Sequence, residues 1–292
     1  MTDSYRDDTD TLARLIAPRF SLAGCIFAAI IRDTRSKSLS EADRYNFFPA
    51  SPLCAVSWFF EGESRLIVDG WPPGSSALGR LPRFSISGPQ SRPMLSWNPG
   101  PVFAMTVGFY PDAWQLLTGR SVEAIFDQSI AARLAVDGRM ATLLESVFGS
   151  PGDAQSRFDG LQDALEPVWA AVRPAGFPAS HRLQDWTRSV ARRAVVSRFG
   201  QSARQAQRRI KSLTGATRRS LDGFANVEAL YERYLQSPER RLADIAADHG
   251  FADQSHMGRE VRRVTGLSPA RLNAVIATAE PFWVYRLFGE RF

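Results

Sequence analysis

The stretch that decides the fold of the second half of the chain is Gly250-Phe251-Ala252-Asp253-Gln254-Ser255-His256, followed by a run that ends in Thr265-Gly266. Gly250 permits a positive φ, which lets the chain leave one helix and turn sharply into the next. Asp253 is a preferred N-cap residue for the second helix. The apolar residues of the run recur at helical spacing; they are Met257, Val261 and Val264. The stretch therefore predicts a helix, a tight turn and a second helix.

A similar stretch lies 51 residues earlier in the chain. There Ser202 takes the place of the N-cap, Gly200 stands near the turn, and Thr214-Gly215 ends the run. The apolar face of this earlier run is Ala206, Ile210 and Leu213. One basic amphipathic helix is weak evidence, but two copies of the same cap, turn and stop are much stronger. We therefore expect two helix-turn-helix units in tandem.

Basic residues concentrate in the same region. Residues 181–275 hold 18 Lys/Arg and 9 Asp/Glu, a net charge of +9, while the rest of the chain carries −3 of the overall +6. Such asymmetry indicates that one domain meets a polyanion. Nearly all of these cations are arginines, whose forked guanidinium suits phosphates and guanine edges.

The tandem region resembles a known family. Leu242-Ala243-Asp244-Ile245-Ala246 through His256, then Arg259 and Thr265-Gly266-Leu267-Ser268-Pro269, is similar to the signature of the AraC/XylS family of transcription regulators. The resemblance implies a seven-helix domain over residues 181–275, in which a connecting helix at roughly 218–235 joins the two units. It also implies that both recognition helices enter successive major-groove segments, about 34 Å apart.

The resemblance assigns the base-reading residues to the starts of the two recognition helices. In the first unit they are Arg204, Gln205, Gln207 and Arg208, and in the second they are Gln254, Ser255, His256 and Arg259. Residues better placed to hold phosphates, which position the protein without reading sequence, are Ser202, Lys211, Arg262 and Arg263. His256 keeps a second interpretation, as a structural residue packed on the turn.

The first half of the chain has a different texture. Residues 1–12 are polar and expected to be disordered. Short apolar runs separated by Gly, Pro and Ser turns then predict an antiparallel sheet or small barrel; they span residues 25–31, 55–60, 66–68, 84–87 and 102–107. Helical patterns begin at about Pro111 and near Ser121, and continue through residues 140–148 and 158–172. The apolar faces of these helices either pair with a second copy of the chain or pack on their own sheet.

The expected fold class is therefore α+β. A β-rich, sensor-like or dimerisation-like domain covers residues 13–175, with trailing helices from about residue 111. An all-α DNA-binding domain covers residues 181–275, and an aromatic tail covers residues 276–292. Because an exposed aromatic patch is rare, we expect the tail to fold back on the protein or to join an interface.

The β-rich half also resembles sensor-like domains that precede this DNA-binding domain, most clearly from Phe109-Tyr110-Pro111-Asp112-Ala113-Trp114 to Ile125-Phe126-Asp127. This looser resemblance implies effector binding, dimerisation or both. Candidate pocket-lining aromatics are Trp58, Phe60, Trp71, Phe84, Trp97 and Phe103. Aromatics at alternating strand positions are more often ordinary core residues.

The expected partner is double-stranded DNA. Further candidates are RNA polymerase, a small-molecule effector at the N-terminal domain, and a second copy of the chain. No catalytic set, cofactor or metal site is expected, because no G-x-S-x-G motif is present and the two cysteines lie apart from the histidines. No apolar run approaches the roughly 20 residues of a membrane span, and residues 1–10 do not read as a secretory signal. The expected location is the cytoplasm.

Two alternatives stay open. A non-specific nucleic-acid-binding protein would show strong salt dependence with little sequence preference. A DNA-repair enzyme fused to the same DNA-binding domain would need an activated cysteine. Cys25 and Cys54 lie in apolar runs, which disfavours that second alternative.

Overall fold

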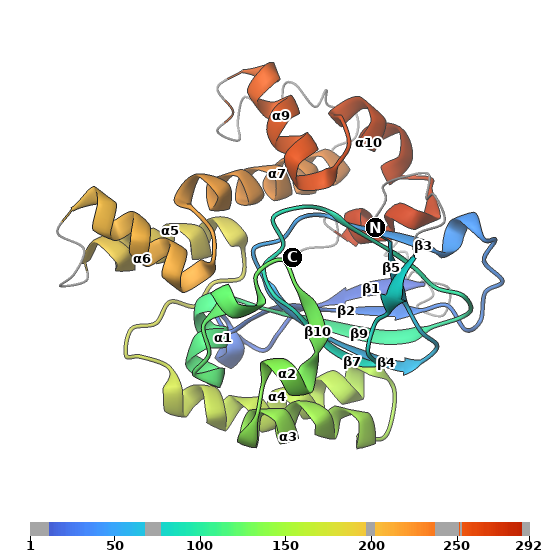
Figure 1. Ribbon diagram of the computed structural model, residues 1–292, viewed down its shortest axis with the longest axis horizontal. Helices are drawn as coiled ribbons and strands as arrows, with labels where there is room; N and C mark the ends of the chain where they lie inside the picture. Colours follow the sequence, from blue (N-terminus) through green and yellow to red (C-terminus); the bar gives the residue numbers. More distant parts are fainter. Residues whose placement is uncertain (1–11, 68–76, 197–201, 237–250, 252, 288–292) are drawn as a thin grey trace, which may run out of the picture.

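Two antiparallel sheets form the first half of the chain (Figure 1). The computed structural model describes residues 12–67, 77–196, 202–236, 251 and 253–287. Within these residues the larger sheet runs, in spatial order, β1 (Ala13–Ile16), β2 (Ile26–Asp33), β9 (Phe103–Phe109), β4 (Cys54–Glu61), β7 (Phe84–Ser87) and β10 (Ser129–Ala131). The smaller sheet runs β3 (Tyr45–Phe48), β8 (Met94–Trp97), β5 (Arg65–Ile67) and β6 (Ala77–Arg80).

The predicted antiparallel, β-rich first half is confirmed. Each of the five apolar runs falls on a strand, namely β2, β4, β5, β7 or β9. One of them, β9, pairs with both β2 and β4, and it aligns Val107 with Val56 at the centre of the sheet. Both valines are fully buried. Apolar side chains that alternate along a strand can cover one face of the sheet in this way.

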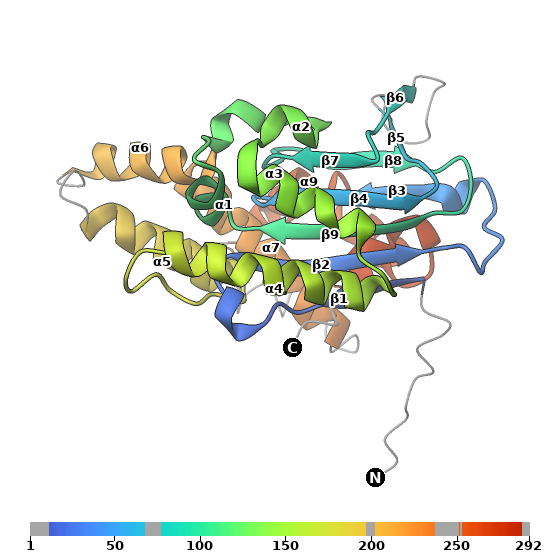
Figure 2. The ribbon, with the colours of Figure 1, turned by 90° about the horizontal axis from the view of Figure 1, so that it is seen from below.

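Helices cover one face of the larger sheet, seen from below in Figure 2. They are α1 (Pro111–Thr118), α2 (Ala132–Ala135), α3 (Gly138–Ser146) and α4 (Ala154–Val172). The buried face of α4 includes the large apolar residues Phe158, Leu161, Leu165 and Trp169. The apolar faces of these helices pack within their own chain, as one of the two interpretations expects. The helix expected near Ser121 is a 3₁₀ turn, Val122–Ile125, which the Ser121 hydroxyl caps.

The second half of the described chain is helical. It contains α5 (Leu183–Val196), α6 (Ala203–Thr214), α7 (Arg218–Gln236), α9 (Gln254–Thr265), α10 (Pro269–Ile276) and α11 (Trp283–Arg286). Figure 1 shows α7 running between the α5–α6 pair and α9. The predicted connecting helix is α7, and the α+β fold class is confirmed. The turn glycines Gly200 and Gly250, and the first helix of the second unit, lie outside the described residues.

A central cavity of about 250 Å³ lies between the two halves. Both sheets line it, together with residues of α5, α7, α9 and α11. The candidate pocket aromatics do not line this cavity: Phe59 does, whereas its neighbours Trp58 and Phe60 face the other side of β4. Period-two alternation sends Trp58 toward the helices, where its indole nitrogen donates to the Leu144 carbonyl oxygen at 2.8 Å. Trp71 lies outside the described residues.

Phe60, Phe84 and Phe103 pack against other aromatic rings, and Phe60 and Phe103 also line a separate hollow of about 500 Å³. Phe60 and Phe84 both place their rings edge-on to Phe148, and Phe60 also lies against Phe103. These contacts match the interpretation of alternating strand aromatics as core. Across the described helices, none combines the length and the apolar character that crossing a membrane requires.

Candidate nucleic-acid interface

The first candidate recognition helix, α6, starts at a complete capping box. The Ser202 hydroxyl accepts from the Gln205 amide at 3.3 Å, and the Gln205 side-chain oxygen accepts from the Ser202 amide at 3.1 Å. Two amides at the helix start are thereby satisfied. Ala206, Ile210 and Thr214 form the buried face. The helix carries four cations and no acidic residue, so its outer surface is positively charged.

The second candidate recognition helix, α9, is also twelve residues long. Asp253 caps it by accepting from the His256 amide at 2.6 Å. Its buried face is Met257, Val261, Val264 and Thr265. Gly258 lies on the helix with open space around the position that a Cβ would take. The predicted caps and apolar faces of both helices are therefore present.

Both helices end in the same way. In α6 the Thr214 hydroxyl donates to the Ile210 carbonyl at 2.8 Å and accepts from the Ala216 amide at 3.2 Å. In α9 the Thr265 hydroxyl makes the equivalent contacts at 2.7 Å and 3.2 Å. Gly215 and Gly266 follow in the left-handed region, at φ 74° and 77°. The threonine hydroxyl forms hydrogen bonds with backbone groups of the last turn, and the glycine adopts the positive φ that reverses the chain.

The predicted contact residues lie on the outer surfaces of α6 and α9. Nine of the ten are exposed: Arg204, Gln205, Gln207, Arg208, Lys211, Gln254, Ser255, Arg259 and Arg262. His256 is half-buried, and its ring lies edge-on to Phe251 at 5.8 Å between centroids. That contact agrees with the structural interpretation of His256.

Two residues that we expected to hold phosphates make side-chain contacts within the protein. Ser202 uses its hydroxyl for the capping box. The Arg263 guanidinium pairs with Glu260 at 2.9 Å, stacks on Phe224 of α7 at 4.6 Å and reaches the Ser220 carbonyl oxygen at 3.3 Å. Arg263 therefore joins α9 to α7. Spacing along one helix does not reveal that a neighbouring helix holds the side chain.

A hollow of about 650 Å³ separates the two recognition helices, and sequence reasoning did not find it. Gln207 of α6 and His256 of α9 lie on its two sides, and residues of α5 and α7 line the rest. The cations that line it are Arg188, Arg218 and Arg219. Arg188 pairs with Asp185 at 3.5 Å and Arg218 with Asp222 at 2.8 Å, whereas Arg219 is exposed. The arginine enrichment was the only sequence signal for these residues.

The comparisons with known proteins identify this region. A family model described as a helix-turn-helix domain matches residues 195–274. The C-terminal region is an AraC-type helix-turn-helix domain. The match supports a DNA-binding transcriptional regulator of the AraC type. A comparison with curated proteins gave no match.

Solved structures of ToxT from Vibrio cholerae are similar to most of the chain at low identity. An apo lysine-to-alanine variant is 10% identical over 84% of this chain and 97% of its own, with a TM-score of 0.38. ToxT bound to (E)-4-(8-methylnaphthalen-1-yl)but-3-enoic acid is 11% identical over 79% and 95%, with a TM-score of 0.36. Wild-type ToxT bound to an unsaturated fatty acid is 11% identical over 78% and 94%, with a TM-score of 0.35.

The first unit of the AraC-type domain is held against α1. Asp112, which is buried, accepts from the Trp186 indole nitrogen at 2.9 Å and pairs with Arg193. Gln115 donates to the Ser212 and Leu213 carbonyl oxygens at the C-terminal end of α6, at 3.1 and 2.9 Å. The exposed start of α6 thus lies at the end of the helix away from the β-rich half.

The second unit of the AraC-type domain is held at the same end of its recognition helix. The Ala50 amide donates to the Val264 carbonyl oxygen at 2.7 Å, and Gly266 lies against Pro93. The Tyr285 hydroxyl is 3.5 Å from the Thr265 carbonyl oxygen. The β-rich half therefore contacts both recognition helices at their C-terminal ends.

The two cysteines do not resemble activated nucleophiles. Cys25 and Cys54 are fully buried and carry free thiols. Burial raises the pKa of both thiols well above the usual value, and the nearby Asp112 carboxylate adds to the rise in pKa. A methyl-accepting cysteine needs an accessible thiolate, so this geometry disfavours the DNA-repair alternative.

Proposed function

We propose that this protein regulates transcription by reading two adjacent major-groove segments of one DNA duplex with α6 and α9. The observation that carries the proposal is the structural repeat: two twelve-residue helices share an N-cap, a Thr-Gly stop and an exposed polar start. A recognition helix reaches base edges mainly through residues near its start. The region matched by the helix-turn-helix family model contains both helices.

Base contacts fall to the exposed polar residues at the helix starts. Arginine can grip the two acceptors of guanine and glutamine can pair with adenine. In the first unit, Arg204, Gln207 and Arg208 have this role; in the second, Gln254, Ser255 and Arg259. Gln205 also reads DNA, although its side-chain oxygen already serves the capping box. Reading with Gln205 therefore requires its amide nitrogen, a donor.

Phosphate contacts fall to cations farther from the helix starts. Lys211 and Arg262 lie near the C-terminal ends of α6 and α9 and are exposed. Arg219, on the rim of the hollow between the helices, adds a contact where the duplex passes from one major-groove segment to the next. Each such contact releases counterions, which makes affinity fall as salt rises.

The test is selection of duplexes from a random library by the full-length chain, followed by footprinting. We expect enriched sites with two conserved blocks about 10 base pairs apart, the distance of one helical turn. A matched variant, Arg204→Ala with Arg259→Ala, should lose the enrichment. Equal retention of all duplexes, with a steep salt dependence, would instead support non-specific binding.

The central cavity supports a second part of the proposal, a small apolar effector. Leu183 of α5, Phe224 of α7 and Val264 of α9 all line it, opposite residues of both sheets. A ligand there would touch the β-rich half and the AraC-type domain together. A ligand shifts an equilibrium between arrangements only by its differential affinity for them, and a cavity with walls from both halves provides that difference.

Effector binding is tested by a thermal-shift screen of compact apolar compounds on the full-length chain. A hit should lose its shift in Ala55→Leu, which fills part of the cavity from β4, and keep it in Ala124→Leu, at an exposed position. An equal shift in both variants would place the compound elsewhere.

A further inference from the structure

The segment of residues 280–287, here named the C-terminal segment, is packed into the protein. Phe282, Trp283, Val284, Tyr285 and Leu287 are all buried. Trp283, Val284 and Leu287 form part of the wall of the central cavity. The segment is neither a sheet strand nor part of the helix-turn-helix repeat. Reading of DNA therefore does not explain why the C-terminal segment packs into the protein.

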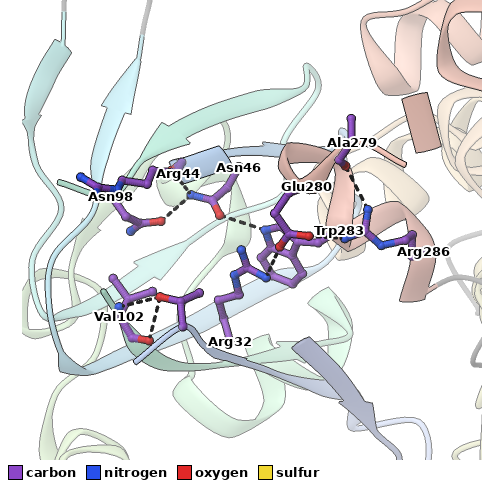
Figure 3. Close-up of polar contacts among 10 residues, drawn as sticks. Arg32, Arg44, Asn46, Asn98, Val102, Ala279, Glu280, Trp283 and Arg286 are labelled. Carbon is purple, nitrogen blue, oxygen red and sulfur yellow. Dashed lines mark hydrogen bonds and ion pairs between the residues drawn. The ribbon is translucent and has the colours of Figure 1, made fainter. Parts of the chain in front are cut away.

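The β-rich half recognises three chemical groups of the segment, and Figure 3 shows the contacts of two of them, the Glu280 carboxylate and the Trp283 indole. Arg32 of β2 pairs with the Glu280 carboxylate at 2.7 Å and lies over the Trp283 ring at 4.8 Å. Asn46 of β3 accepts from the Trp283 indole nitrogen at 2.9 Å. A further contact stacks Phe47 on the Phe282 ring, with centroids 4.4 Å apart and planes 7° apart. A carboxylate, an indole and a phenyl ring each meet a complementary partner, as a bound ligand would.

The Arg32 contact is only partly satisfied. Arg32 is 6% exposed, and its Nε has no hydrogen-bond partner among the described residues. Burial lowers the pKa of the Arg32 guanidinium, and Glu280 raises it back in part. Glu280 is shared with Arg286, which binds it at 2.7 Å. The attraction within a buried ion pair that has an unsatisfied donor offsets little of the free energy that desolvation costs. The contact between Arg32 and the C-terminal segment is therefore suited to breaking and re-forming.

The same segment holds the second unit of the AraC-type domain. Tyr285, fully buried, reaches the Thr265 carbonyl oxygen at the end of α9, beside the Ala50–Val264 contact. The described contacts that hold the first unit come instead from α1, through Asp112 and Gln115. Release of the C-terminal segment would therefore loosen the second unit and leave the first in place.

We propose that the C-terminal segment is an autoinhibitory latch, which closes the central cavity and pins the second helix-turn-helix unit to the β-rich half. The effect on DNA rests on the proposed function. The two units must match a groove spacing that the duplex sets. The second unit is held by contacts within the protein. It must lose those contacts before it can move to match the groove spacing. The closed latch lowers DNA affinity, and the open latch raises it.

The first experiment tests the latch without DNA. The chain shortened to end at Ala279 is mixed with a fluorescent peptide of residues 279–292, and binding is followed by anisotropy. We expect saturable binding, and at least about ten-fold weaker binding for the same peptide with Trp283→Ala, since a buried aromatic anchor dominates such contacts. The Glu280→Gln peptide should bind with intermediate strength. No binding, or equal binding by the parent and Trp283→Ala peptides, would overturn the proposal.

The second experiment uses full-length chains and does not depend on the shortened chain folding. Trp283→Ala should speed amide hydrogen exchange in residues 280–287 and 264–266, but not in residues 212–215. Phe20→Ala is the matched control, because Phe20 is an exposed aromatic; it should change neither region. Unchanged exchange in the C-terminal segment of Trp283→Ala would overturn the latch.

The third experiment measures the consequence for DNA, on a duplex enriched from the random library. Trp283→Ala should bind it about five-fold or more tightly than the parent chain, within the range usual for coupled sites. Unchanged or weaker binding would overturn the autoinhibitory role. If the parent chain enriches no duplex at all, the proposed function fails, and the peptide and exchange measurements still decide whether the segment is a latch.

Discussion

The two helix-turn-helix units share a motif but differ in how they are built and held. The first has a reciprocal capping box and a recognition helix without glycine, and a buried carboxylate with a hydrogen-bonding glutamine fixes it to α1. The second has a single aspartate cap and Gly258 within its helix, and a backbone amide with the C-terminal segment holds it. Repeated sequence therefore does not mean equal mechanical roles. The first unit is the fixed reference, and the second is the adjustable one.

The largest expected effect comes from breaking the anchor of the first unit. Asp112→Ala leaves Arg193 without its carboxylate and leaves the buried Trp186 indole nitrogen unsatisfied. We expect the free energy of unfolding, measured with urea, to fall by about 3 kcal/mol. Asp185→Ala removes an exposed pair with Arg188 and should cost only about 0.5 kcal/mol. Equal losses would mean that Asp112 is not the anchor.

The next effect tests whether both units read bases. Arg204→Ala and Arg259→Ala should each weaken binding to the enriched duplex by about 2 kcal/mol and relax specificity at a single base pair. The two relaxed positions should lie about one helical turn apart. Arg271→Ala, an exposed cation on α10 outside the recognition helices, is the control. A uniform loss on all duplexes would make the arginine concerned a phosphate contact.

The N-caps of α6 and α9 test the difference between the two units with a smaller expected effect. Asp253→Ala removes the one side-chain cap of α9, and we expect a cost of about 1.5 kcal/mol. Ser202→Ala removes half of a reciprocal box, because Gln205 still reaches the Ser202 backbone amide, so about 0.7 kcal/mol is expected. Faster amide exchange at His256 and Gln205, respectively, is the readout. A larger cost at Ser202 would reverse this ranking of the two helix starts.

The smallest effect concerns the helical glycines. Gly258→Ala adds a methyl group in open space on α9 and should stabilise the protein by about 0.8 kcal/mol. Gly223→Ala is the matched control on α7, where an added Cβ would overlap the Glu260 carboxylate and the Arg263 guanidinium. Displacing that pair opposes the gain in helix propensity, so Gly223→Ala should stabilise the protein less than Gly258→Ala does. Thermal unfolding of both variants checks the difference in size.

Features governed by neighbours along the chain were predictable. Caps, Thr-Gly stops and apolar faces depend on residues within one or two helical turns, so the limits of α6 and α9 follow from the residues alone. The run at residues 84–87 coincides with β7 for the same reason. Strands β3 and β8, which pair with Asn46 opposite Ser96, were missed. Nothing near either strand indicates that partner.

The contact surface was predicted as a set of residues but not as a shape. Helical spacing puts Arg204 and Arg259 on exposed faces, where the structure has them. The same spacing assigns Arg263 to phosphates, although α7 holds it through Phe224 and Ser220. Whether a surface cation is available depends on what packs beside it, and that packing partner lies 39 to 43 residues away in the chain.

The sequence by itself determined the class of this protein: a β-rich first half, an arginine-rich tandem repeat, and two helices with polar starts. Each of these follows from local periodicity, capping and composition, which act over a few residues. Only the tertiary structure decided that Asp112 anchors one unit, that the C-terminal segment seats on Arg32 and Asn46, and that a cavity joins the two halves. These contacts join residues between 74 and 248 positions apart, where no local rule acts and burial, hydrogen bonding and charge together select the partner.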